Sequence, residues 1–188
     1  MNRFRNFIAI TTAIIALAAV GVPAQSYAGS KRYANRASDS NISQQIYHEL
    51  RMLPHYGVFD HITYQVNGGR VILSGKVYSL GTKSSFVSAV KHIPGVTNVV
   101  SNIEDLPPSS FDNQIRRQAL RTFANHGLSG YFWEVNPDVR IIVENGHITL
   151  EGYVMNTGDR NAMNIYANGI PNVFSVTNNL IVGKPVKG

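Results

Sequence analysis

Cysteine is absent from the 188-residue chain, which excludes disulfide bridges and thiolate metal sites. The acylated cysteine of a bacterial lipoprotein is also missing, so any membrane contact has to be made by side chains. The sequence contains no phosphate-binding glycine loop, no Gly-x-Ser-x-Gly and no histidine pair at helical spacing. We therefore predict a non-enzymatic protein without catalytic residues, metal, cofactor or small-molecule substrate.

The net charge of +6 does not mark a nucleic-acid-binding face. Residues 39–106 carry five basic and five acidic side chains, and residues 111–182 carry five arginines and six carboxylates. The positive excess therefore lies at the two ends of the chain, where it forms no clustered basic groove. We predict no nucleic-acid partner.

The N-terminus has the features of a secretory signal peptide, which we predict over residues 1–28. Two arginines precede an apolar run over residues 7–22, and small residues allow cleavage after Ala28 or Ala24. The run is shorter than the ~20 residues of a spanning helix, and an uncleaved anchor is the alternative. The sequence thus predicts export to the periplasm, with a possible peripheral position at a membrane.

The rest of the chain is an internal repeat. Residues 69–103 align without a gap with residues 146–180, and ten of the 35 aligned pairs are identical. Such a duplication predicts two domains of one fold. The expected boundaries are a linker at 29–38, a first domain at 39–106, a linker at 107–110, a second domain at 111–183 and a tail at 184–188.

Each repeat has the periodicity of helix, strand, strand, helix, strand. Apolar residues alternate on both sides of Asn67-Gly68-Gly69 and of Asn145-Gly146, which predicts a hairpin in each repeat. The last strand of the second repeat is expected over 173–182. Helices with one apolar stripe are expected to begin at these residues: Asp39 or Ser40, Thr82, Asp112 and Asp159. The fold class is therefore α+β, with two tandem domains that each place two helices on one face of a three-stranded mixed sheet.

Glycines also occupy the interior of predicted strands. Gly75 and Gly152 stand at equivalent positions of the two repeats, inside the second strand of each. An interior glycine indicates a bulge or a close approach of another segment, here the second helix. We interpret both glycines as structural.

The two repeats differ most between the first helix and the first strand, where the second repeat has four additional residues. The site predicted from this difference consists of arginines on the preceding helix and aromatic residues in the enlarged loop: Arg116, Arg117, Arg121, Tyr131, Phe132 and Trp133. Aromatic rings beside arginines suit a lipid headgroup boundary and also a protein interface. The alternative is that the rings close the open end of the second core.

The repeated pattern Gly-x-Val/Ile-x-Leu-x-Gly-x-Val, then a basic residue in the second helix, then Ile-Pro-x-Val-x-x-Val-x-Asn, resembles the BON domain. One departure is Asn172, which stands where the first repeat has Gly95. The resemblance implies an exported protein that associates with an anionic phospholipid surface and supports envelope integrity or osmotic stress tolerance. The alternative that it leaves open is a periplasmic protein-protein interaction or scaffold module of an envelope or secretion assembly.

Overall fold

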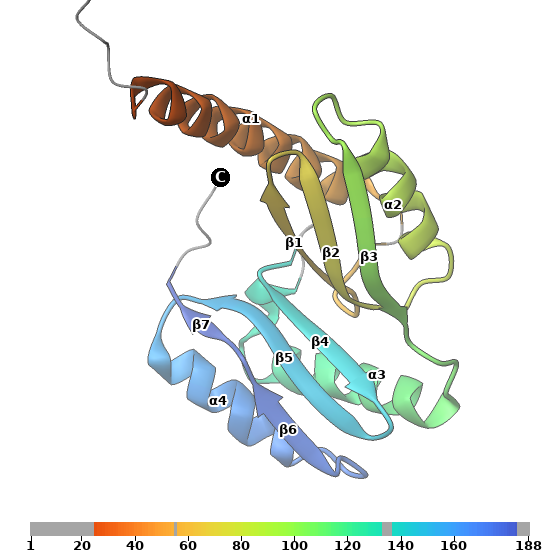
Figure 1. Cartoon of the computed structure of the whole chain (residues 1–188). Helices are drawn as coiled ribbons and strands as arrows, with labels where there is room; N and C mark the ends of the chain where they lie inside the picture. Colours follow the sequence, from red (N-terminus) through yellow and green to blue (C-terminus); the bar gives the residue numbers. More distant parts are fainter. Residues whose placement is uncertain (1–24, 55, 133–136, 184–188) are drawn as a thin grey trace, which may run out of the picture.

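The computed structural model describes residues 25–54, 56–132 and 137–183, with side chains from Ser38 onward. It contains two units in sequence, each a mixed sheet with two helices on one face (Figure 1). The predicted fold class is confirmed. Residues 1–24, and with them most of the predicted signal peptide, lie outside the described residues, so that assignment stays a prediction.

The first unit contains α1 (Gln25–Met52), β1 (His61–Asn67), β2 (Arg70–Val77), α2 (Thr82–Lys91) and β3 (Asn98–Asp105). β1 runs antiparallel to β2, and β3 lies parallel to β2 on its other side. The core is formed by apolar residues that recur at helical spacing in α1 and at alternate positions in the strands, as the sequence predicts. They include Ile42, Ile46, Val71, Leu73 and Phe86.

Helix α1 begins earlier than the sequence analysis predicts. It starts at Gln25, so residues 29–38, for which the sequence predicts a linker, are helical. No proline interrupts this segment, and most of its residues are compatible with a helix. Asp39 therefore lies inside the helix and is not its cap. Its carboxylate instead accepts hydrogen bonds from the backbone nitrogens of Gly68 and Gly69, at 2.8 and 3.0 Å, in the hairpin turn.

The second unit repeats this arrangement with α3 (Ser110–Asn125), η1 (Ser129–Tyr131), β4 (Val139–Glu144), β5 (His147–Val154), α4 (Thr157–Asn168), β6 (Ser175–Asn178) and β7 (Ile181–Val182). β4 is antiparallel to β5, whereas β6 and β7 both run parallel to β5. The strand predicted over 173–182 is thus split in two. The side chain of Asn178 accepts a hydrogen bond from the backbone nitrogen of Leu180 at 3.1 Å, and such local bonds compete with the sheet ladder.

The helix caps of the second unit also differ from the prediction. Ser109 caps α3 by accepting from Asp112 N at 3.1 Å, and Asn156 caps α4 by accepting from Asp159 N at 2.9 Å. Asp112 and Asp159 therefore lie in the first turns of their helices, three residues after the caps, and are not the caps themselves. The Asp112 carboxylate binds the hairpin nitrogens of Asn145 and Gly146 at 3.0 and 2.8 Å, as Asp39 does in the first unit.

The two units pack against each other along β4. Every residue from Val139 to Val143 is buried, although a strand on the open edge of a sheet normally exposes alternate residues. The loop between α1 and β1 covers this strand. Ile141 N donates to Val58 O at 2.8 Å, and Val58 and Phe59 pack against the core of the second unit.

Polar contacts surround this seam. The Arg140 guanidinium donates to Gly57 O at 2.5 Å and lies over the Tyr56 ring, 4.3 Å from its centroid. Farther along, Lys76 of β2 forms an ion pair with Glu144 of β4. Arg140 is only 5% exposed, so its contacts with Gly57 and Tyr56 replace the water that its charge would otherwise require.

The two interior glycines are explained by the neighbouring strand. Their backbones are left-handed, with φ of 135° at Gly75 and 115° at Gly152. A Cβ at either position would lie 2.0 Å from a carbonyl oxygen at the start of the paired segment, His61 O or Asp138 O. The strand register is unbroken. The expected bulge and the expected approach by the second helix are therefore wrong, while the structural role is retained.

Replacing Gly152 by alanine should lower the free energy of unfolding by about 3 kcal/mol, because the new Cβ meets a backbone carbonyl and the residue has a positive φ. Gly130→Ala is the matched control, since a Cβ there has no neighbour within 4 Å. Urea unfolding of both variants measures the difference. Equal midpoints for the two alanine variants would contradict this account of the glycine.

Candidate binding surface of the second repeat

Helix α3 carries the three arginines of the predicted site. Its apolar stripe of Ile115, Ala119 and Phe123 is fully buried against the second sheet, as the helical period predicts. The arginines occupy the positions between and opposite these residues. The structure therefore decides for each arginine whether its guanidinium reaches solvent.

Arg116 does not reach solvent, and its predicted role as a surface contact is wrong. Its side chain is 2% exposed and donates to Asn113 Oδ1 at 2.7 Å and to the carbonyl oxygen of Val143. Its guanidinium also lies over the ring of Tyr78 from the first unit, 4.5 Å from the centroid. Burial lowers the pKa of Arg116, and the nearby Asp112 carboxylate opposes that change.

Arg117 and Arg121 are both exposed. They are four residues apart and so share one face of α3, pointing away from the core. Within the described part of the chain neither forms an ion pair with a carboxylate. The equivalent positions of α1 are Gln44 and His48, so this pair of arginines belongs to the second repeat alone.

Tyr131 performs a structural task that an aspartate performs in the first unit. In the first unit, Asp60 accepts a hydrogen bond from Tyr78 N at 2.6 Å, just after β2. In the second unit the equivalent nitrogen, that of Met155, donates to the Tyr131 hydroxyl at 3.0 Å. That hydroxyl in turn donates to Asp159 Oδ2 at 2.5 Å. Burial and this carboxylate raise the pKa of Tyr131.

The remaining aromatic residues of the enlarged loop divide into one that is placed and one that is not. Phe132 stacks on Phe123, with centroids 5.5 Å apart and planes 11° apart, and packs against the second core. Trp133 lies outside the described residues. Tyr131 and Phe132 thus face the core, which leaves Arg117 and Arg121 as the exposed described members of the predicted site.

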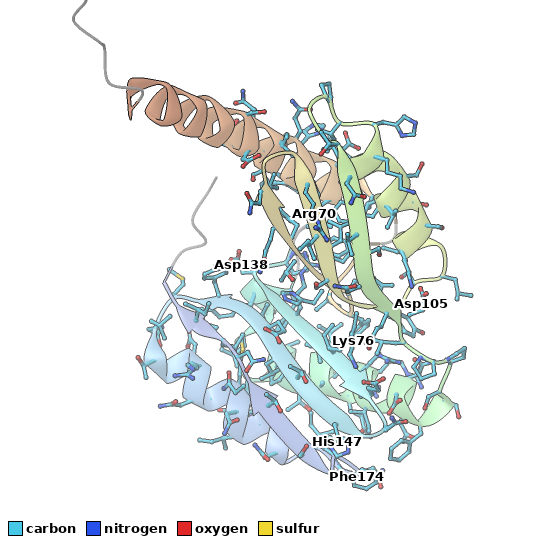
Figure 2. All side chains as sticks on the ribbon, viewed as in Figure 1. Arg70, Lys76, Asp105, Asp138, His147 and Phe174 are labelled. Atoms are coloured by element: carbon cyan, nitrogen blue, oxygen red, sulfur yellow. The ribbon has the colours of Figure 1, made fainter. Side chains whose placement is uncertain are left out.

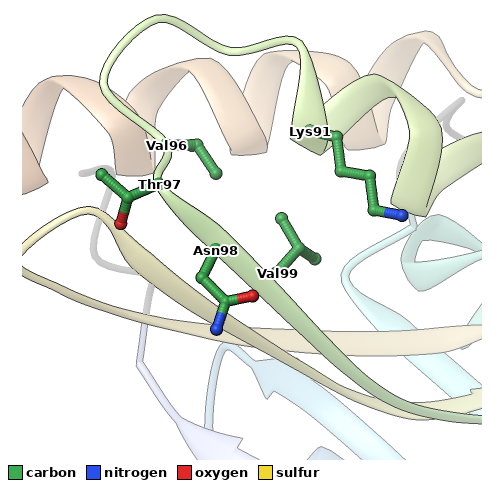
Figure 3. Close-up of a pocket in the computed structure, with 5 residues that line it drawn as sticks. All are labelled: Lys91, Val96, Thr97, Asn98 and Val99. Carbon is green, nitrogen blue, oxygen red and sulfur yellow. The ribbon is translucent and has the colours of Figure 1, made fainter.

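A hollow of about 310 Å³ lies between the end of α2 and the start of β3 (Figure 3). Its lining consists of Lys91, Val96, Thr97, Asn98 and Val99. These residues include one cation and no carboxylate or histidine, so the hollow offers no acid–base pair. Among the described residues, no group of three His, Cys, Asp or Glu side chains is arranged to hold a metal ion.

The profile of the BON domain matches this chain twice, over residues 38–104 and 111–184. The chain belongs to the BON domain family. BON domains are binding modules of the bacterial envelope that interact with phospholipid, and the tandem arrangement agrees with the two units of the structure.

This BON protein is also similar to solved structures of low sequence identity. Among curated proteins none matches the chain. Two solved structures of CdsD, a structural protein of the type III secretion system of Chlamydia trachomatis, share 14% identity with it. The first, a C-terminal domain, aligns over 74% of this chain and 96% of its own, with a TM-score of 0.31. The second aligns over 78% and 94%, with a TM-score of 0.32.

Within the part of this BON protein that the structure describes, no helix combines the length and the apolar character needed to cross a bilayer.

Sequence reasoning missed two groups of residues. The alternating pattern before Asn145-Gly146 does not predict the burial of Arg140, although the near-continuous apolar run of β4 indicates burial on both faces. Phe111 and Phe174 were passed over, although they replace Ser38 and Thr97 of the first BON repeat.

The neighbouring residues Arg116 and Arg117 of α3 should contribute very differently to stability. Arg116→Ala should lower the free energy of unfolding by about 3 kcal/mol, because it deletes buried hydrogen bonds and a cation–π contact. Arg117→Ala should change it by less than about 0.5 kcal/mol, as expected for an exposed residue. Chemical unfolding of the two variants makes the comparison. Equal unfolding midpoints for the two variants would contradict the structural role of Arg116.

Proposed function

We propose that this protein is an exported, non-enzymatic module that associates peripherally with anionic phospholipid surfaces and supports envelope integrity or osmotic stress tolerance. Two BON domains in tandem support the phospholipid partner. The N-terminal apolar run supports export to the periplasm.

The observation that carries the proposal is the pair of exposed arginines on α3. Arg117 and Arg121 are free of carboxylate partners among the described residues, so their charges are available to lipid phosphates. Arginine forms strong charge-assisted hydrogen bonds to phosphate oxygens, and each cation near an anionic surface contributes about 1 kcal/mol. We retain Trp133 in the proposed contact, because its position in the sequence is within the stretch between α3 and β4, where the second repeat has four additional residues.

Core packing of Phe132 changes the proposed mechanism. With that ring stacked on Phe123, it cannot enter a bilayer without leaving the second core. Arg116 is likewise engaged by Asn113 and Val143. The proposed electrostatic contact therefore rests on Arg117 and Arg121, and the helix that holds them is fixed by its buried stripe.

Vesicle flotation tests this function. The exported protein should float with vesicles that contain phosphatidylglycerol, and Arg117→Ala with Arg121→Ala should weaken partitioning roughly tenfold or more. The control is Arg70→Ala with Lys91→Ala, which removes the same charge from exposed positions of the first repeat. Added salt should weaken binding of the wild type, since exposed charges are screened.

Two results would oppose the lipid proposal. One is the absence of flotation by the wild type, and the other is an equal loss of binding in the control variant. In the first case the alternative function, a protein-protein interaction module of an envelope or secretion assembly, is favoured. That alternative has support in the seam itself, where a loop of one BON unit binds the sheet edge of the next through Val58 and Ile141.

A further inference from the structure

Two phenylalanine rings meet at one end of the second unit. Phe111 lies in the first turn of α3, and Phe174 lies in the loop before β6. Their centroids are 6.0 Å apart, and the side chains are 38% and 69% exposed. His147, at the start of β5, lies edge-on to Phe174 with centroids 5.9 Å apart. Figure 2 shows His147 and Phe174 at the end of the unit that points away from the first repeat.

The backbone holds these rings in place. Phe174 N donates to Gly146 O at 2.9 Å, which fixes the loop against the hairpin turn. The Phe174 ring rests directly on Gly146, since a Cβ added there would lie 2.7 Å from a ring carbon. Asn172, two residues before Phe174, has a φ of 69°, which is the left-handed conformation of a tight turn. The ring pair is therefore a preorganised apolar surface.

The fold does not require aromatic residues at this end. In the first repeat, Ser38 and Thr97 occupy the positions of Phe111 and Phe174, and both are exposed. Thr97 N donates to Gly69 O at 2.8 Å, so the same backbone contact forms without the ring. Two exposed phenylalanines consequently contribute little that the fold needs, which points to a role in binding.

The surroundings of the ring pair carry little free negative charge. Asp112 follows Phe111 but is 1% exposed, and both of its oxygens accept hydrogen bonds from the hairpin. Glu144, at the end of β4, is paired with Lys76. Phe111 belongs to the first turn of the helix that carries Arg117 and Arg121. Exposed rings thus lie near a helix whose two exposed arginines form no ion pair with a described carboxylate, and this combination is complementary to an anionic interface.

We infer that Phe111 and Phe174 form an apolar anchor that enters the headgroup region of an anionic phospholipid bilayer. This inference rests on the proposed function and adds the residues that penetrate the surface, whereas the arginines attract it. Phe174 lies at the end of the second unit that points away from the first repeat, and the ring of Phe111 is beside it, so that a soft interface can surround both rings. Transfer of exposed aromatic side chains to that depth lowers the free energy of the bound state, because their apolar rings leave water.

Replacing the rings by the residues of the first repeat tests the anchor. Phe111→Ser with Phe174→Thr should lower partitioning into phosphatidylglycerol vesicles by about tenfold, because two exposed rings are lost. The control is Met155→Thr, which removes a side chain that is 76% exposed at the other end of β5. The control should bind like the wild type. Thermal unfolding by circular dichroism verifies that each variant is folded.

A depth measurement does not depend on the stability of the double variant. With Trp133→Phe and Phe174→Trp together, the only tryptophan lies at the ring pair. Its emission should shift to the blue and be quenched by brominated lipid when vesicles are added. A reporter variant with Met155→Trp in the same Trp133→Phe background should show neither change.

The outcomes separate this inference from the proposed function. Equal vesicle binding by the wild type and the Phe111→Ser, Phe174→Thr variant overturns the anchor and leaves the lipid function in place. The same holds if the tryptophan at 174 is not quenched by lipid bromine while the reporter floats with the vesicles. A wild type that does not bind vesicles overturns both. Loss of binding in the double variant together with quenching at 174 supports the anchor. If Met155→Thr weakens binding equally, the effect is nonspecific and the anchor is overturned.

Discussion

The covering of β4 is the contact on which the arrangement of the two BON units depends. An edge strand leaves unpaired backbone groups, and β4 would also expose Arg140 and Ile142 on its outer face. The loop after α1 supplies a carbonyl to Ile141 N and a carbonyl and an aromatic face to Arg140. The backbone nitrogen of Ile141 and the guanidinium of Arg140 thus have hydrogen-bond partners in the first unit. The two units are therefore held together by specific polar pairing as well as by buried apolar area.

Duplication preserved the backbone contacts but not the side chains that make them. Asp39 and Asp112 bind the hairpin turns in the same way. The nitrogen that follows the second strand, by contrast, is bound by Asp60 in one repeat and by the Tyr131 hydroxyl in the other. The four additional residues of the second repeat thus bring an aromatic residue to a position where the first repeat uses a carboxylate. A sequence difference between repeats is therefore not by itself a sign of function.

Exposure distinguishes the differences that are available for binding from those that are structural. Arg116 is buried where the two units meet, and Phe132 packs against Phe123 in the second core. Arg117, Arg121 and the pair of Phe111 and Phe174 are exposed and have polar counterparts in the first repeat, so the fold has no need of them. The proposed membrane contact is accordingly built on α3 and the hairpin end of the second unit. Cations and rings supply complementary forces there, one long-ranged and screened by salt, the other short-ranged and apolar.

The sequence by itself determined the duplication, the order of elements, the two hairpins and the inward stripes of α1 and α3, because these depend on local periodicity and turn chemistry. Tertiary structure alone decided the start of α1, the division of the last strand and the fate of each arginine. Arg116 lies three residues before Ala119, so the helical period places it at the edge of the core, yet only the approach of Tyr78 and Val143 makes burial of its charge favourable. The period of one repeat identifies the faces of its own elements and carries no information on which face the other repeat covers.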